Sequence, residues 1–196
     1  MSKKMIEKKE KKKKKVLLKD AKLSKRGISY LIDWYVGGLF TSLPIGLFSL
    51  KMYNTMLHQD IMNFPSPQGL LAGLAGLVGA IVYFFVIPAF VWKGQTFGKR
   101  VCHVRIVNMD DTEVSAKTLL LRQLVGVFLI EGGLVTASTI LHQVFMLVTS
   151  INIVKPLMYV GLAISGVSAL LVLFKNDHRA IHDYLAKTRV VEGNAE

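Results

Sequence analysis

Four apolar stretches of membrane length constrain the fold of this chain more than any other feature. A bilayer core of about 30 Å requires about 20 helical residues, each rising about 1.5 Å. The stretches that meet this length are residues 28–50, 69–92, 123–148 and 156–174. The third contains Glu131, so it could instead lie partly in the membrane interface. We predict an all-α membrane protein, a bundle of four transmembrane helices.

The charged residues are separated from these apolar stretches. The chain is 52% hydrophobic and 19% charged, with a net charge of +12, and its mean hydropathy is +0.41. Lys and Arg gather in the N-terminal tail, in residues 93–117 and after Phe174. The positive-inside rule places all three basic segments in the cytoplasm. Both termini are therefore predicted to be cytoplasmic in a multi-pass protein of the cytoplasmic membrane.

Three regions follow along the chain. Residues 1–25 are predicted to be a disordered lysine-rich tail, residues 26–191 a membrane domain, and residues 192–196 a C-terminal tail. Basic residues near a membrane surface attract anionic lipid by about 1 kcal/mol each. The predicted headgroup contacts are Lys11, Lys12, Lys13, Lys14 and Lys15. The tail has no interleaved aromatic residues for base stacking, so nucleic acid is not an expected partner.

The basic loop between the second and third helices has a β-like pattern. Val104, Ile106 and Val107 form a short apolar run, and residues 108–112 have the composition of a turn. Glu113 and Val114 could begin a return strand. We therefore predict a small cytoplasmic hairpin that packs against the rest of the protein, because two strands alone are marginal in water.

Asp33 lies within the first apolar stretch, where an unpaired charge costs roughly 2.5–3.5 kcal/mol. Arg26 precedes it by two helical turns on the same face, but helical side chains lean toward the N-terminus, so Arg26 points away. Ser29 is expected to donate to the carboxylate. We expect Arg122 or Arg179 to supply the charge partner and to form a structural clamp between helix ends.

Glu131 is a second carboxyl at membrane depth, with no basic residue one turn away on either side. Burial without a counter-ion favours its protonated form. A proton-coupled carrier site needs such a group, and an inert carboxyl that hydrogen-bonds to a neighbouring helix would behave in the same way. Asp33 and Glu131 are therefore the candidates for ion or proton handling.

No pattern in the sequence indicates an enzyme. Residues 94–99 are one residue short of a phosphate loop, and Arg100 stands where Ser or Thr would bind magnesium. The pair His182 and Asp183 has no nucleophile or metal-ligand spacing around it. Asp183 and Thr188 are expected to cap or fix the segment after the last helix. We expect no catalytic residue, no cofactor and no metal.

Three motifs in order resemble the RDD family of small bacterial membrane proteins, named for one arginine and two aspartates. They are Arg26–Asp33, then Lys93–Arg100 followed by Arg122, and finally Arg179–Val191 with its His-Asp pair and Thr-x-Val-Val ending. The resemblance implies a charged cluster near the inner face of the membrane. Its members here would be Arg26, Asp33, Arg122, Arg179 and Asp183.

The resemblance also implies two functions. Some family members are linked to exchange of sodium or other cations for protons, and others look like accessory or regulatory subunits. We expect one of two functions. The first is a monovalent cation/proton antiporter, which would require a homo-oligomer because four helices are few for a carrier. The second is a non-transporting accessory or regulatory protein that binds a membrane partner or anionic lipid. The expected location is the cytoplasmic (inner) membrane.

Overall fold

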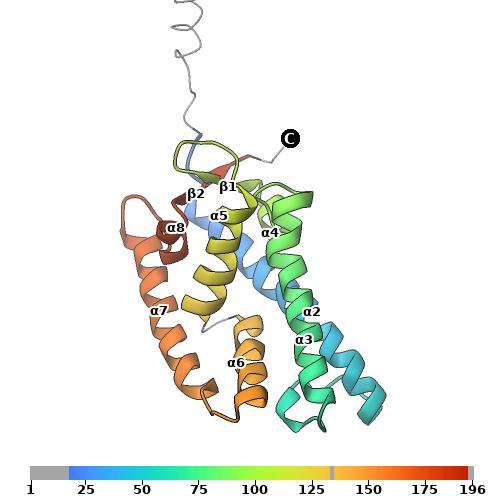
Figure 1. Ribbon diagram of the computed structural model, residues 1–196. Coiled ribbons are helices and arrows are strands. Elements are labelled where there is room, and N and C mark those ends of the chain that lie inside the picture. Colours follow the sequence, from blue (N-terminus) through green and yellow to red (C-terminus); the bar gives the residue numbers. More distant parts are fainter. Residues whose placement is uncertain (1–17, 133–134, 194–196) are drawn as a thin grey trace, which may run out of the picture.

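Among the described residues, three helical segments are long and apolar enough to cross a membrane. The computed structural model describes residues 18–132 and 135–193 (Figure 1). The three candidate spans are α2 (Leu23–Tyr53), the segment Gln68–Val91 and α7 (Val154–Phe174). These spans confirm the first, second and fourth predicted helices, although α2 begins before the predicted residue 28. The Lys11–Lys15 run lies outside the described residues.

The second span consists of two parts with different hydrogen bonding. It begins as α3 (Gln68–Ile81) and continues as a π-helix, η2 (Val82–Val91), which contains Pro88. Proline lacks the backbone N–H that an α-helix uses, and π turns, which are rare overall, occur mostly as interruptions inside α-helices. The span ends where the N–H of Trp92 donates to the carbonyl of Ile87 at 2.9 Å.

The long helices run between two ends of the bundle, and the short elements and loops lie at these ends (Figure 1). The end that we call the sheet end holds β1 (Val104–Asn108), β2 (Thr188–Glu192), the short helices α4 (Phe97–Val101) and α8 (Ile181–Leu185), and both ends of the described chain. The opposite end, the loop end, holds the connections 54–67 and 150–153. The described parts of the three basic segments therefore lie together at one end.

The third predicted helix is broken, and the prediction of one helix over residues 123–148 is wrong. The chain leaves the sheet end as α5 (Ala116–Leu120) and a π-helix, η3 (Leu121–Ile130). After the break it resumes as α6 (Thr136–Thr149), which ends at the loop end (Figure 1). The four predicted helices are thus three candidate spans and one segment of two shorter helices.

The break is stabilised by serine side chains that bind carbonyl groups left free at the end of η3. Ser138 Oγ donates to the carbonyl of Phe128 at 2.9 Å, and Ser165 Oγ donates to the carbonyl of Glu131. Such carbonyls have no partner within their own helix. A Cβ at Gly132 would lie 2.5 Å from Ser138 Oγ, so the glycine permits this close approach.

The predicted hairpin is also wrong in its pairing. β1 pairs antiparallel with β2, with Ile106 opposite Val190, and the expected return strand contributes only an isolated bridge between Val107 and Glu113. Asp20 bridges to Val191 and extends this contact to the start of the chain. Within residues 1–25, predicted to be a disordered tail, Asp20 takes part in this bridge and residues 23–25 form the first turn of α2. A pairing between segments far apart in sequence buries the apolar side chains that a local hairpin would leave exposed.

Small residues on α3 allow α2 and α3 to pack closely. A Cβ at Gly79 would lie 2.0 Å from the carbonyl oxygen of Phe40, and one at Gly76 would lie 2.9 Å from that of Thr41. Small residues permit such approaches between helices in lipid, where burial itself supplies little driving force. Side chains between these helices and α6 form an apolar core of Ile45, Ile61, Phe64, Ala72, Ile140 and Val144.

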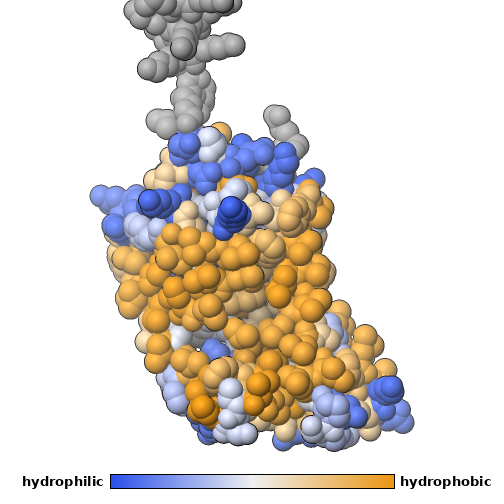
Figure 2. Space-filling view, in the orientation of Figure 1, coloured by the Kyte–Doolittle hydropathy of each residue, from blue (hydrophilic) through white to orange (hydrophobic). Residues whose placement is uncertain are grey.

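The outer surface matches this architecture. Figure 2 shows hydrophilic residues at the sheet end and a broad hydrophobic belt between the two ends. Large apolar side chains such as Leu47, Val78 and Leu170 are more than half exposed on the helices of this belt. An exposed apolar belt of this kind is the surface that a bilayer covers.

Candidate functional site

Asp33 is buried in α2 and accepts four hydrogen bonds. Its Oδ1 accepts from Tyr83 Oη at 2.6 Å and from the Gly98 N–H at 2.8 Å. Its Oδ2 accepts from Thr96 Oγ1 at 2.5 Å and from Lys99 Nζ at 2.8 Å. The carboxylate is therefore paired with an ammonium group and joins α2 to η2 and α4. We call these five residues the Asp33 clamp.

The predicted partners of Asp33 are wrong. Neither arginine pairs with it, and Ser29 Oγ donates instead to the carbonyl of Arg26 at 2.9 Å. The partner is Lys99, in the same motif that resembles an incomplete phosphate loop. The buried polar residues Gln95 and Thr96 of that motif fix the loop, because Gln95 Nε2 donates to the carbonyl of Val104 at 2.8 Å.

The clamp requires a glycine at position 98, which gives the first prediction. A Cβ there would lie 2.4 Å from the carbonyl oxygen of Ser29 and 2.7 Å from Asp33 Oδ1. Gly98→Ala should therefore destabilise the protein by about 1–3 kcal/mol, as overpacking does. Thermal unfolding in detergent checks this. The control is Gly27→Ala, where a Cβ meets no atom within 4 Å; equal melting temperatures for the two variants would contradict the prediction.

Asp183 is the centre of a second buried cluster at the sheet end. Its Oδ1 accepts from Arg122 Nε at 3.0 Å and Nη2 at 2.8 Å, and its Oδ2 accepts from Arg26 Nη2 at 3.2 Å. Thr188 Oγ1 donates to Oδ1 at 3.2 Å, and the Ala180 N–H donates to Oδ2 at 3.3 Å. The expectation that Asp183 and Thr188 fix this segment is therefore confirmed. We call this group the Asp183 cluster.

Electrostatics keep Asp183 ionised. Burial opposes its ionisation, but Arg122, His182 and Arg26 outweigh burial and hold the pKa of this carboxyl well below its usual range. Arg179 does not join the ion pair. Its guanidinium donates to the carbonyls of Thr188 at 3.1 Å and Asp183 at 3.0 Å, and so binds the backbone around the cluster.

The predicted single cluster of five charged residues is thus divided into two sites. Asp33 belongs to the clamp with Lys99, whereas Arg26, Arg122 and Asp183 form the other site with Arg179 beside it. Sequence spacing placed Arg26 correctly away from Asp33. It gave no signal for Lys99, because the pairing depends on how the loop after η2 folds back onto α2.

Glu131 lies at the break of the third segment, and it has a partner that the sequence did not reveal. Its Oε2 lies 2.8 Å from His182 Nδ1, and its Oε1 accepts from the His182 N–H at 2.7 Å and from Ser168 Oγ at 2.9 Å. The interpretation of Glu131 as a carboxyl without a partner is therefore corrected: His182 of α8 and Ser168 of α7 bind it, and both lie far from it in sequence. We call Glu131, Ser165, Ser168 and His182 the Glu131 site.

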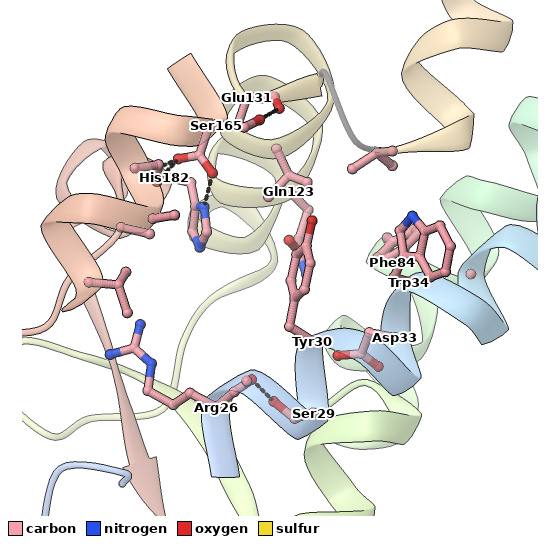
Figure 3. Close-up of a pocket in the computed structure, with 18 of the residues that line it drawn as sticks. Arg26, Ser29, Tyr30, Asp33, Trp34, Phe84, Gln123, Glu131, Ser165 and His182 are labelled. Atoms are coloured by element: carbon pink, nitrogen blue, oxygen red, sulfur yellow. Dashed lines mark hydrogen bonds and ion pairs between the residues drawn. The ribbon is translucent and has the colours of Figure 1, made fainter. Parts of the chain in front are cut away.

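A cavity of about 370 Å³ lies between α2 and the Glu131 site. Figure 3 shows Arg26, Tyr30 and Asp33 on α2 across this space from Glu131 and His182. Apolar side chains such as Trp34, Phe84 and Val127 line it as well, together with further polar groups that include Arg122 and Gln123. The cavity therefore brings together both carboxyl groups that the sequence singled out, one held in the clamp and the other beside an imidazole.

This combination defines a helical membrane protein with two buried ion clusters and a carboxyl–imidazole pair at a broken helix. The chain belongs to the RDD family, whose pattern it matches over residues 21–187. The match includes every residue of the Asp33 clamp and of the Glu131 site, and Asp183 with both of its arginines.

A protein of Bacillus subtilis (strain 168) is similar to part of the chain. Over 110 residues the chain is 31% identical to the uncharacterized protein YckC, which covers 56% of this chain. The aligned part spans about half (54%) of the length of YckC. No solved structure matches the chain. The comparisons therefore establish the family, and the chemistry has to be argued from the site.

Proposed function

We propose that the protein exchanges a monovalent cation for a proton across the cytoplasmic (inner) membrane, with Glu131 as the group that binds each in turn. The observation that carries this proposal is the helix break, where a carboxylate beside an imidazole faces a cavity. In carriers, broken helices supply backbone carbonyls and helix C-terminal ends that coordinate cations. Unwound backbone at membrane depth is tolerated where it lines such a cavity.

Oxygen atoms at the break have the chemistry of a site for a small hard cation. They are the carboxylate and backbone carbonyl of Glu131 and the hydroxyl groups of Ser165 and Ser168, which already contact these oxygens. Hard cations prefer oxygen ligands, and the negative end of η3 adds to the attraction. One carboxylate with neutral oxygens balances the charge of a monovalent cation.

In this proposal His182 transfers the proton to and from Glu131. Imidazole rings relay protons near neutral pH, and Nδ1 of His182 is in hydrogen-bond contact with Glu131 Oε2. When a cation binds the carboxylate, the proton leaves through the imidazole to the cavity. When the proton returns, it neutralises Glu131 and the cation is released. One proton is exchanged for one cation across the membrane when the site opens to one side for the first step and to the other side for the second.

Asp33 has a structural role in this proposal. Its two oxygens already accept four hydrogen bonds, one of them from an ammonium group, so a cation would have to displace Lys99. The orientation follows from charge, because the basic segments lie together at the sheet end. The positive-inside rule then places the sheet end and both termini in the cytoplasm, and the broken segment makes the fourth crossing.

The test is proton movement in proteoliposomes, followed with a pH-gradient dye while sodium, potassium and lithium are added in turn. Wild-type protein should show cation-dependent proton movement. Glu131→Gln keeps the shape of the side chain but cannot titrate, so exchange should disappear while the protein stays folded. The matched control is Glu113→Gln, an exposed carboxyl paired with Lys93 at the sheet end, which should exchange normally.

Two results would count against this assignment. If wild-type protein moves no protons with any of the three cations, the exchange proposal fails. If Glu131→Gln exchanges as well as wild type, Glu131 is not the binding group.

The second candidate is a non-transporting accessory protein that binds a membrane partner or another copy of itself. It is favoured by α7, where Tyr159, Leu170 and Phe174 are 55–79% exposed. Such a face can pack against a helix from another subunit or against lipid. This function would take the place of exchange if wild-type protein gave no proton movement in the same assay.

A further inference from the structure

A second, more open cavity of about 770 Å³ lies between α2 and α6, toward the loop end. Its polar lining comes from Gln59 and Asp60 in the connection after α2 and from Thr139 and Gln143 on α6. We call it the loop-end cavity and the one beside Glu131 the inner cavity. The loop-end cavity plays no part in the site described above.

The two cavities share a wall. Tyr30 and Trp34 of α2, together with Val135 and Thr136 at the start of α6, line both of them. Tyr30 and Trp34 are one helical turn apart, so their rings stand on the same face of α2. Among the described residues, this shared layer of side chains lies between the space beside Glu131 and the loop-end cavity.

The loop-end cavity carries oxygen atoms suited to a cation. Asp60 Oδ1 accepts from Gln143 Nε2 at 3.0 Å and from the Met62 N–H at 3.1 Å, and its Oδ2 accepts from Asn63 Nδ2 at 3.1 Å. These donors are neutral, so, unlike Asp33 with Lys99, this carboxylate has no cationic partner among the described residues that a cation would have to displace. Within the described part of the chain, Gln143 Oε1 is shielded from solvent and accepts no hydrogen bond. A buried acceptor without a donor is destabilising, and a cation that also contacts the Asp60 carboxylate would satisfy it.

We propose that the loop-end cavity is the external mouth of the cation pathway, where Asp60 and Gln143 hold a monovalent cation, and that Tyr30 and Trp34 are the closed gate between this mouth and Glu131. The inference rests on the proposed exchange and assigns its outer route. The gate has to close because a continuous path would let cations leak without counter-movement of protons. Two aromatic rings on one helix face open the path when they change rotamer, and α2 need not move.

The test measures access to the site and does not depend on exchange. In intact cells, single cysteines are introduced into a Cys102→Ser background and treated with a membrane-impermeant, positively charged thiol reagent. Asp60→Cys should label rapidly, Thr136→Cys more slowly, and Ser168→Cys, behind the gate, hardly at all. Asp110→Cys at the sheet end should label only after the membrane is permeabilised.

Opening the gate should then expose the inner cavity. Adding Tyr30→Ala and Trp34→Ala to the Ser168→Cys protein should raise its labelling rate at least tenfold. Tyr35→Ala is the matched control: it removes the neighbouring aromatic ring of α2, which is not among the lining residues of either cavity, and should leave the rate unchanged. Thr136→Cys needs no gate variant, so the shared wall is tested even if the double alanine variant does not fold.

Each result decides between the alternatives. Labelling of Ser168→Cys that is indifferent to the gate substitutions, protection of Thr136→Cys, or labelling of Asp110→Cys in intact cells would overturn the proposed route. If the gate variants label as expected but wild-type protein exchanges no cation for protons, the route stands and the exchange proposal falls. If exchange occurs without gated labelling, exchange stands and the route falls.

Discussion

Replacing Asp183 by alanine should lower the free energy of unfolding by about 3–5 kcal/mol, because it leaves buried charges without a partner. Arg122 is held by this carboxylate through two donors, and Arg26 by a third. The side chain of Asp183 is completely buried, so water cannot replace it. The expected result is a large loss of folded, monodisperse protein in detergent and a lower melting temperature.

The same cluster predicts a dependence on pH. The folded-state pKa of Asp183 is held below its unfolded value of about 3.9. A carboxyl with a lowered pKa contributes stability that is present above the unfolded pKa and is lost as pH falls through the folded one. Wild-type protein should therefore lose stability below about pH 4, and Asp183→Asn should lose less over the same range.

Asp177→Asn is the matched control, since this carboxyl lies six residues earlier in an exposed pair with Lys175. Exposed pairs contribute little to stability, and this variant should melt as wild type does. Similar melting temperatures for Asp183→Ala and wild-type protein would show that the two arginines do not depend on this carboxylate.

Asp33→Ala is expected to have the second largest effect, a loss of about 3–5 kcal/mol in the free energy of unfolding. A second substitution at its partner Lys99 should recover part of this loss. The substitution leaves the Lys99 ammonium, whose side chain is only 14% exposed, beside Tyr83 and Thr96 without a counter-charge. Removing the ammonium as well should restore part of the loss. The double variant Asp33→Ala/Lys99→Met should thus be more stable than Asp33→Ala alone.

A double-mutant cycle in detergent measures this coupling. The comparison is the same cycle with Arg122 in place of Lys99, because Arg122 pairs with Asp183 and not with Asp33. Additive losses with Arg122 and a coupling of at least 1 kcal/mol with Lys99 are expected for a buried ion pair. Additive losses with Lys99 and a coupling with Arg122 would show instead that Asp33 is paired with Arg122.

The spans could be predicted from sequence because length and apolarity are local properties. α7 ends at the predicted residue Phe174. Glu131 already lowered the apolarity of the third segment. The break itself depends on Ser138 and Ser165, which satisfy carbonyls from other elements, and spacing along one helix cannot reveal such contacts.

The charge partners could not be predicted for a similar reason. An arginine fork was the expected partner of Asp33 because its two bonds suit a carboxylate. The fold gives that geometry to Asp183 instead, and Asp33 is bound by Lys99 with hydroxyl and amide donors. His182 contacts Glu131 although the two residues lie 51 positions apart in sequence. The pairing of β1 with β2 is a contact of the same kind.

That pairing has a consequence for how the protein is made. The segment that carries Asp183 and β2 leaves the ribosome after α2, η3 and α7, so Arg26 and Arg122 enter the membrane region before their carboxylate exists. During synthesis these two guanidinium groups must remain hydrated or bind lipid phosphate. Antiparallel pairing of Thr188–Glu192 with Val104–Asn108 then delivers the missing charge. The segment that carries Asp183 therefore completes both the ion pairs and the sheet last during synthesis, and a nascent protein interrupted before residue 183 would keep two uncompensated cations.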